Sequence, residues 1–282
     1  MTDPTTGAPM TGAPTGAAPE PAPEILTERR GAVEWVIFNR PRARNAMTPW
    51  MEDRLIEICR AVDADPTVKA LALTGAAGDK PAFMAGADLS CLQSVSSPED
   101  FTILETRAEA AAMALEAVRV PTVAVLSGPC IGEGALLASS CDVRIASPSV
   151  RFGFPIARTV GNCLSVKNLA RLSALLGTAR TREMIFSARL LGAADLAAAG
   201  AVRTVVAGED ELTAHGQQVA EELAALAPLT LWATREGLRR LRDNSLPRDI
   251  DGDLLRRCYL SADYQEGIAA FLEKRPPVWS GS

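Results

Sequence analysis

The stretch that decides the fold is V-P-T-V-A-V-L-S-G-P-C-I-G-E-G-A-L-L-A-S-S-C, residues 120–141. Residues 122–126 within it form a short, nearly all-apolar and β-branched run, which is typical of a strand buried on both faces. Glycines at positions 128, 132 and 134 then break the strand. The uncharged segment 135–139 that follows is a good helix former. We therefore predict a strand, a tight loop and a buried helix.

A turn of this kind leaves backbone N–H groups free at the start of a helix. These N–H groups have no partner within the helix and lie at the positive end of its dipole, so they can hold an oxyanion or a phosphate. The glycines alone fit an ordinary loop between a strand and a helix equally well. A second stretch of sequence separates the two interpretations.

That second stretch begins with another buried-strand pattern, Ala70 to Thr74, and ends in F-M-A-G-A-D-L at residues 83–89. Taken together with residues 121–134, this loop resembles the enoyl-CoA hydratase/isomerase (crotonase) superfamily. Three further segments agree with the family in the same order along the chain, namely residues 40–46, 141–153 and 266–279. The resemblance covers roughly residues 25 to 279, and five ordered motifs are more specific than any one of them.

The resemblance implies an α/β fold with a crotonase-like spiral core of ββα units and a helical C-terminal lobe. We divide the chain into a tail (1–24), a core (25–207) and a lobe (208–282) that the family uses to form trimers. The tail repeats Thr, Gly, Ala and Pro with almost no large apolar side chains, so we predict that it is disordered. From Glu209 onward, four amphipathic helical segments replace the alternation of strands and helices.

Short sequence patterns predict where the other helices and strands lie. A hairpin is expected around Gly31, and Thr48 is a plausible cap for a helix that has Pro49 at its first position. A second helix is expected from Ser97 to Val118. Further strands are predicted at 68–74, 143–145, 150–152 and 202–206, and further helices at 164–176, 181–187 and 193–199.

Length and composition exclude several classes of function. The chain has 282 residues, which is enough for a sizeable core, with 48% hydrophobic and 22% charged residues. A net charge of −5 argues against a broad basic surface for nucleic acid or anionic lipid. Neither a bilayer-spanning apolar run nor the layout of a secretory signal is present, so we expect a cytoplasmic protein.

The cysteines and the histidine exclude other kinds of site. Six cysteines are scattered without a C-x-x-C pair, which favours reduced, packed thiols over a disulfide framework or a zinc site. His215 is the only histidine, and no G-x-S-x-G motif accompanies it, so a Ser-His-Asp triad is not expected. We predict that His215 lies at the surface.

By resemblance, two backbone N–H groups, those of Ala87 and Glu133, bind the thioester oxygen of an acyl-CoA. Rigid donors of this kind stabilise an enolate, and each is typically worth about 3 to 4 kcal/mol of barrier. The Glu133 side chain places a carboxylate where many members have a bare glycine. This carboxylate either acts as a base or serves as a favourable acid in the first turn of its helix. Asn162 is a third candidate, since an amide orients a water or a carbonyl but takes no proton.

The resemblance also implies where coenzyme A lies, between the loop at 40–46 and the loop at 83–89. Basic side chains there suit its phosphates, although solvated surface charges are the alternative interpretation. Asp88 fits a role in bracing its loop better than a chemical one. The substrate-binding positions are Arg42, Ala43, Arg44, Ala46, Phe83, Ala85, Gly86, Asp88, Leu89, Pro129, Gly132, Leu136, Pro155, Ile156 and Lys274.

The acid and base residues depart from the family pattern. Hydratases of the family carry glutamates at the positions that Leu136 and Ile156 occupy here. Related isomerases use a carboxylate in the segment that corresponds to residues 160–163, where this chain has no acid. Hydration needs one group to deprotonate water and another to deliver a proton, each worth roughly a hundredfold or more. Neither apolar side chain can do either.

The sequence therefore predicts an acyl-CoA enzyme of this family that stabilises a thioester enolate, with ordinary hydration in doubt. Isomerisation, decarboxylation or thioester hydrolysis through Glu133 or Asn162 are the alternatives among reactions. A CoA-thioester-binding protein that has lost catalysis is the alternative from another class. Coenzyme A enters as part of the substrate, no metal ion or separate cofactor is expected, and the family implies a homotrimer or a dimer of trimers.

Overall fold

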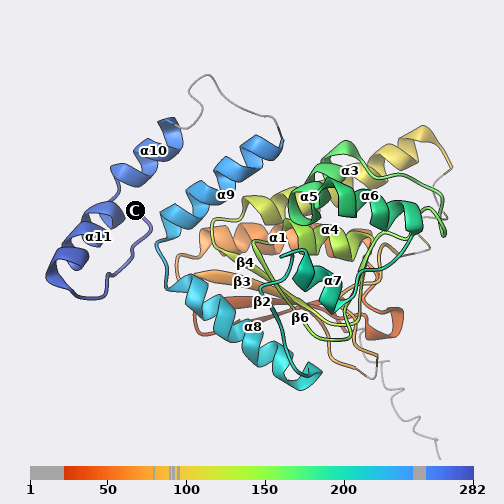
Figure 1. Ribbon diagram of the computed structural model, residues 1–282, viewed down its shortest axis with the longest axis horizontal. Coiled ribbons are helices and arrows are strands. Elements are labelled where there is room, and N and C mark those ends of the chain that lie inside the picture. The colour runs from red at the N-terminus through yellow and green to blue at the C-terminus, as the bar shows by residue number, and fades with distance from the viewer. Residues whose placement is uncertain (1–21, 79, 89, 91–92, 94–95, 244–251) are drawn as a thin grey trace, which may run out of the picture.

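The computed structural model describes residues 22–78, 80–88, 90, 93, 96–243 and 252–282 (Figure 1). Most of the predicted tail, together with Leu89, Cys91 and Pro247, lies outside these residues. The last tail residue, Glu24, is held in place, because its carboxylate accepts a hydrogen bond from Thr48 at 2.6 Å and pairs with Arg40 at 3.0 Å.

A six-stranded sheet forms the centre of the molecule, in the order β1-β2-β3-β4-β6-β8. β1 and β2 form the predicted antiparallel hairpin around Gly31, whose φ is +61°, and all other neighbouring pairs are parallel. The bounds are β1 Ile25–Arg30, β2 Val33–Phe38, β3 Ala70–Gly75, β4 Thr122–Leu126, β6 Val143–Ala146 and β8 Thr204–Val205.

A second, two-stranded parallel sheet differs from expectation. It consists of β5 (Pro129–Ile131) and β7 (Arg151–Gly153). The prediction of a plain loop after β4 was therefore wrong for these three residues. Since β5 is paired by β7 and by a bridge to Met84, both distant from it along the chain, its own short sequence carries no signal for a strand.

The helices follow the predicted order, with ends shifted by a few residues. Their bounds are η1 Pro41–Ala43, α1 Pro49–Ala64, α3 Pro98–Ala117, α4 Glu133–Ser140, α5 Val166–Leu176, α6 Thr178–Ser187, α7 Ala193–Ala198, α8 Glu209–Ala224, α9 Pro228–Arg242, α10 Gly252–Tyr259 and α11 Ala262–Glu273. Thr48 caps α1 by accepting a 3.2 Å hydrogen bond from the N–H of Met51. Ser97 and Asp100 form a reciprocal capping box at α3.

Helices cover both faces of the main sheet (Figure 1). α1, α3 and α4 lie on one side, and α8 packs on the other side against β3 and β4. β4 serves both layers, since Ala124 and Leu126 face one cluster of buried residues while Val123 and Val125 face the other. The prediction of a strand buried on both faces is confirmed, and this strand fixes where the following loop and α4 begin.

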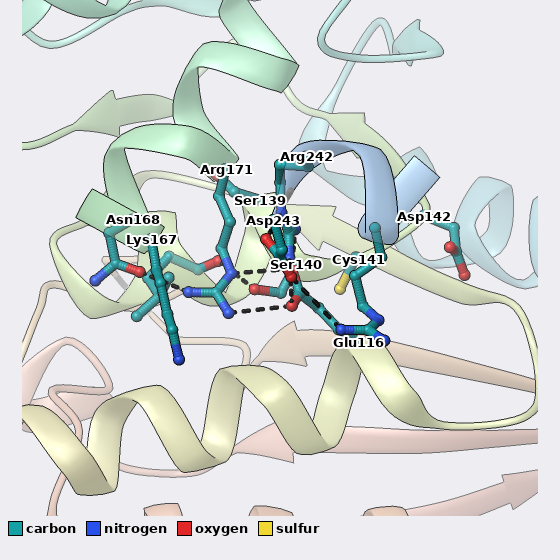
Figure 2. Close-up of polar contacts among 12 residues, drawn as sticks. Glu116, Ser139, Ser140, Cys141, Asp142, Lys167, Asn168, Arg171, Arg242 and Asp243 are labelled. Atoms are coloured by element: carbon teal, nitrogen blue, oxygen red, sulfur yellow. Dashed lines mark hydrogen bonds and ion pairs between the residues drawn. The ribbon is translucent and has the colours of Figure 1, made fainter. Parts of the chain in front are cut away.

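The C-terminal helices α9, α10 and α11 project to one side of the sheet (Figure 1). A buried ion cluster ties α9 to the core (Figure 2). In it, Glu116 of α3 accepts hydrogen bonds from Arg171 of α5 at 2.9 and 3.1 Å and from Arg242 of α9 at 3.0 Å. The division between core and lobe at residue 208 stays a prediction, although α8 belongs to the layers around the sheet.

Candidate active site

A cavity of about 320 Å³ opens where the loop at 84–88, the start of α4 and the start of α1 meet the segment 154–164. Its walls are mostly apolar, and among the lining residues are Leu104, Ala108, Ile131, Leu136, Phe154 and Ile156. Its polar lining includes Glu52, Glu105 and Glu133, together with Asn162 and Asn168. An apolar cleft with a few polar groups is the usual form of a small-molecule site.

Two loops from different parts of the chain are hydrogen-bonded together at this cavity. The N–H of Met84 donates to the carbonyl of Pro129 at 2.9 Å, and that of Ile131 donates to the carbonyl of Met84 at 2.9 Å. The backbones then come still closer, because a Cβ atom added to Gly132 would lie 3.4 Å from the Cα of Gly86. Gly132 has φ +56°, a conformation that favours glycine. The residues that follow these two glycines therefore face one space.

Those residues are Ala87 and Glu133, and both line the cavity. Glu133 is the first residue of α4, so its N–H has no acceptor within the helix. Ala87 is held on either side, since the carbonyl of Gly86 accepts from Met47 at 2.8 Å and the N–H of Asp88 donates to Met47 at 2.7 Å. Within the described part of the chain, neither the Ala87 nor the Glu133 N–H has a backbone acceptor. Both remain available to a ligand in the cavity.

The Glu133 side chain is half-buried as a whole, but its carboxyl group is withdrawn from solvent. Among the described residues, its Oε1 atom is buried and has no hydrogen-bond partner. Burial, and then the charge of Glu52 beside it, raise the pKa of Glu133 well above its ordinary value. Glu133 is therefore a neutral acid over a range of pH in which an exposed glutamate is ionised.

Two other carboxyl groups line the same cavity. Glu52 in the first turn of α1 is only 4% exposed, and its Oε2 accepts a hydrogen bond from Nε of Arg107 at 2.9 Å. Burial raises the pKa of Glu52, and the hydrogen bond from Arg107 opposes that change. Burial also raises the pKa of Glu105 on α3, with a smaller contribution from Glu109.

The two positions at which the resemblance implies glutamates in hydratases are part of the cavity wall. Leu136 and Ile156 are 4% and 9% exposed, and both side chains line the cavity. An apolar surface thus occupies both of these places. The polar groups of this cavity come from other positions.

The predicted site residues divide into two groups. Those that line the cavity are Ala85, Gly86, Ala87, Gly132, Glu133, Leu136, Pro155, Ile156 and Asn162. Those that the structure describes outside its lining are Arg42, Ala43, Arg44, Ala46, Phe83, Asp88, Pro129 and Lys274. Phe83 has no exposed surface and packs edge-on against Phe38 at 5.5 Å between ring centroids, so its side chain belongs to the core.

Asp88 braces its loop, as the sequence favours. Its carboxylate accepts hydrogen bonds from the Ser90 hydroxyl at 2.6 Å and from Arg40 at 2.8 Å. The hydrogen bonds from Ser90, followed by that from Arg40, lower the pKa of Asp88 to about 2. A carboxylate that is so strongly bound to its neighbours is a poor proton acceptor at neutral pH.

The three basic residues predicted to bind phosphates, Arg42, Arg44 and Lys274, are exposed. Arg42 and Arg44 belong to the η1 turn, which is joined to the cavity loop because the N–H of Ala85 donates to the carbonyl of Arg44 at 3.0 Å. Within the described residues, neither arginine nor Lys274 forms an ion pair, whereas Arg275 is paired with Glu266 at 2.6 Å.

The described residues give no support to a metal site. No three His, Cys, Asp or Glu side chains among them are grouped to bind a metal ion. Of the five cysteines that the structure describes, Cys163 is the exposed one and lies at the cavity. His215 is half-buried in α8, away from the cavity, so the prediction of a surface position was wrong. In the part of the chain that is described, no helix has the length and apolar character needed to cross a membrane.

Glu52 is the residue that the sequence reading missed. It lies on the face of α1 that also carries Met51 and Leu55, both fully buried. An acidic residue on the apolar face of a capped helix is a signal that the sequence does contain, since a charge there requires a partner. Nothing in the sequence identifies Arg107 or Glu133 as that partner.

Known proteins share this architecture. The sequence profile of the enoyl-CoA hydratase/isomerase family matches residues 28–282. The chain belongs to this family. A probable enoyl-CoA hydratase of Mycobacterium bovis is 31% identical over 260 residues, which is 91% of this chain and 97% of that protein. A crotonyl-CoA hydratase of Syntrophomonas wolfei is 32% identical over 260 residues, which is 89% of this chain and 95% of that protein.

A solved structure agrees with the sequence relatives. An enoyl-CoA hydratase/carnithine racemase from Magnetospirillum magneticum superimposes with a TM-score of 0.84 at 30% identity, covering 93% of this chain and 97% of that one. The predicted family and the crotonase fold are thus confirmed.

Proposed function

We propose that this family member binds acyl-CoA thioesters and forms and reprotonates their enolates, without being an efficient hydratase. The thioester oxygen would accept hydrogen bonds from the N–H groups of Ala87 and Glu133. The observation that carries the proposal is the Glu133 carboxyl, buried and unpartnered among the described residues, at the same cavity as these two free donors. Backbone donors fixed in this way stabilise an enolate without reorganising.

The proton-transfer group in this proposal is the Glu133 side chain. Leu136 and Ile156 offer no acid or base, and Asp88 is engaged by Ser90 and Arg40. Asn162 at the mouth would orient a carbonyl or a water without taking a proton. Transfer of a proton at the α-carbon is the chemistry that one carboxyl beside an oxyanion site supports best, and it underlies double-bond isomerisation.

Coenzyme A would lie outside the cavity, along the two joined loops. Arg42 and Arg44 support this placement, because both are exposed at the η1 turn and unpaired among the described residues. Lys274 would add a further positive charge from the end of α11. Exposed cations without a carboxylate partner suit phosphate groups on Coulombic grounds.

We also propose that the chain forms trimers or dimers of trimers through its C-terminal helices. Several large apolar side chains of these helices are exposed in the single chain, among them Leu238, Leu241, Leu255, Tyr259 and Leu272. Burial against a second copy would remove this surface from water.

Exchange of the α-proton tests the enolate directly. The full chain is incubated with butyryl-CoA in D₂O, and deuterium in the acyl group is measured by mass spectrometry, with hydration of crotonyl-CoA assayed in parallel. We expect exchange by the wild type and little hydration. The Glu133→Gln variant should exchange at least about a hundredfold more slowly while binding butyryl-CoA with similar affinity.

Glu57→Gln, which removes an exposed glutamate from α1, is the matched control and should exchange like the wild type. Tight binding of butyryl-CoA without exchange by the wild type would instead indicate a CoA-thioester-binding protein. Rapid hydration that survives the loss of Glu133 would contradict the proposal.

A further inference from the structure

Glu52 is a buried acid at the cavity for which the proposed function has no use. It lies in the first turn of α1 and points its carboxylate at Arg107 of α3, with 2.9 Å between Oε2 and Nε. Arg107 also pairs with Asp53 through Nη2 at 2.8 Å and donates a hydrogen bond to the carbonyl of Pro49. The guanidinium is therefore fixed by three acceptors on α1, and its position does not depend on a substrate.

Glu52 and Glu133 line the same cavity, Glu52 is 4% exposed, and the Oε1 atom of Glu133 is buried. The charge of Glu52 is, after burial, the main cause that raises the pKa of Glu133. Two carboxylates at one buried site repel each other strongly, so they hold one proton between them rather than ionising together. The two ends of this pair have different surroundings. Arg107 hydrogen-bonds Glu52, whereas Oε1 of Glu133 has no partner among the described residues.

We propose that Glu52 is the positioning residue for Glu133: the two carboxyls share one proton, with Arg107 holding the negative charge on Glu52 and the proton on Glu133. This inference rests on the proposed function, because it assigns a purpose to Glu52 only if Glu133 exchanges protons with a thioester. It supplies a second carboxyl to a cavity that lacks both glutamates of the family hydratases, and it draws that carboxyl from α1.

The number of protons that the pair holds changes during the reaction. In the resting state the pair carries one proton and one negative charge. The Glu133 proton passes to Glu52, and the freed Glu133 carboxylate takes a proton from the substrate α-carbon, so that the C–H bond breaks and an O–H bond forms. The electron pair of the C–H bond moves into the enolate, whose oxygen the two N–H groups hold. The pair is now neutral with two protons, and return of one proton to carbon restores the start.

The opposite order is electrostatically worse. If the pair first gave its only proton to a substrate, two negative charges would face each other in a buried site. The guanidinium of Arg107 would then be the single cation available to compensate both of them. The arrangement thus favours reactions that begin with proton abstraction, which is the order of double-bond isomerisation. Titration behaviour agrees, since burial followed by the charge of Glu52 raises the pKa of Glu133, while Arg107 opposes the same rise in Glu52.

Charged groups on the elements around the pair affect the pKa values of its two carboxyls. Asp53 and Glu52 belong to α1, and Arg107 and Glu105 belong to α3. Glu105 lines the cavity and acts on Glu133 through its charge alone, more weakly than Glu52. It therefore serves as a control for a general loss of negative charge.

Infrared difference spectroscopy of the full chain without substrate tests the shared proton. We expect a protonated carboxyl C=O band at neutral pH that is absent in Glu133→Gln. The band should titrate at lower pH in Glu52→Gln, by about one pH unit or more, because the neighbouring negative charge is gone. In Arg107→Met it should titrate at higher pH, whereas Arg107→Lys should restore most of the wild-type behaviour. Glu105→Gln should move it less than Glu52→Gln.

The pH profile of butyryl-CoA exchange gives a second measurement. The pair abstracts a proton only while it holds a single proton, so the acidic limb reports the loss of the second proton from the pair. This limb should shift to higher pH in Arg107→Met, as the infrared band does. In Glu52→Gln it should also shift to higher pH, opposite to the infrared band, because the buried Glu133 must then ionise by itself. A purely structural role would lower the rate at all pH values and leave the limb in place. Absence of the band in the wild type, or a band that neither variant moves, would overturn the inference. An enzyme that shows the band but no exchange would refute the proposed function while leaving the shared proton established.

Discussion

Glu133 offers two different groups to the same cavity. Its backbone N–H is free because it begins α4, a property that any residue at this position would share. Its carboxyl is neutral because it is buried beside Glu52, a property that depends on this residue type and this neighbour. The backbone N–H can bind an anion, and the carboxyl can give or take a proton. Their combination in one residue means that a side-chain variant at position 133 leaves the backbone donor in place.

The buried carboxyl of Glu133 makes stability depend on pH. Its pKa is raised in the folded chain, so the unfolded chain loses this proton first as pH rises above the ordinary glutamate range. Its contribution to stability is present below the unfolded pKa and is lost as pH rises through the folded pKa. We expect Glu133→Gln to be more stable than the wild type at pH 8 and to lose less stability between pH 5 and pH 8.

Urea unfolding at the two pH values measures this difference, with Glu57→Gln as the control for an exposed carboxylate. A wild type and a Glu133→Gln variant with the same pH dependence would show that the carboxyl is ionised in the folded chain.

The sequence pointed to several residues that line the cavity, but not to the partners of their side chains. Ala87 and Gly132 were expected at the site because small residues after a buried strand mark a backbone that a ligand approaches, and both line the cavity. Leu136 and Ile156 were also placed there. The binding of a thioester oxygen by backbone N–H groups stays a prediction. Glu52 was missed because its significance arises from Arg107 and Glu133, which belong to two other helices.

At the scale of elements, the start of α4 is set by close packing of two backbones. A Cβ atom added to Gly134 would lie 2.5 Å from the carbonyl oxygen and 2.7 Å from the Cβ of Met84. Gly134 has ordinary helical geometry, so the restriction there is space rather than φ. The same contact brings the loop that carries Ala87 against the turn that carries Glu133, and it fixes the relation between the two N–H groups.

Gly134→Ala should therefore damage both stability and activity. Alanine favours a helix, but here its methyl group must displace the backbone at Met84, and overpacking of this kind costs about 1 to 3 kcal/mol. We expect a lower midpoint of urea unfolding and an exchange rate reduced by about tenfold or more, since small misplacements of catalytic groups have large effects.

Gly31→Ala is the comparison, because nothing lies within 4 Å of the added methyl group but φ is +61°. It should lose about 1 kcal/mol of stability and keep its exchange rate. A Gly134→Ala chain with wild-type stability and rate would mean that the two loops do not need this contact.

Elements defined by a local pattern were predicted well. β4 was predicted with its observed ends because its four apolar residues and the β-branched Thr122 carry the signal themselves. α1 was located by the Thr48 cap and Pro49. β5 was not predicted, since Pro129–Ile131 becomes a strand by pairing with β7 and with Met84, which lie far from it along the chain. Pairing between distant segments is a tertiary effect that a single short sequence does not encode.

At the scale of the whole molecule, the ion cluster in Figure 2 connects the C-terminal helices with the cavity. Arg171 is 3% exposed and pairs with Glu116 and with Glu109, the latter at 2.6 Å. It also donates a 2.8 Å hydrogen bond to Oδ1 of Asn168, which lines the cavity. Arg242 joins the cluster from α9 through Glu116. The same buried charges thus affect both the position of α9 and the shape of the cavity wall.

The two arginines of this cluster should differ in importance. Arg171→Met leaves Glu116 with Arg242 alone and removes from Glu109 its closest cation, so two carboxylates lose compensation inside the protein. Removing one partner of a buried ion pair typically costs about 3 to 5 kcal/mol. Arg242→Met leaves the 2.9 Å bond between Arg171 and Glu116 intact and should be the milder change. Urea unfolding of both variants gives the comparison.

The cluster should also respond to acid. Burial alone would raise the pKa of Glu116, but hydrogen bonds from Arg242 and Arg171 outweigh it and lower that pKa. A lowered pKa in the folded chain stabilises it above the ordinary glutamate pKa, and this contribution disappears as pH falls through the folded value. Stability of the wild type should therefore drop below about pH 4.5, and Glu116→Gln should flatten this drop while being less stable than the wild type at pH 7. If Arg242→Met proved as damaging as Arg171→Met, the hold on α9 rather than the compensation of buried charge would be the main contribution of the cluster.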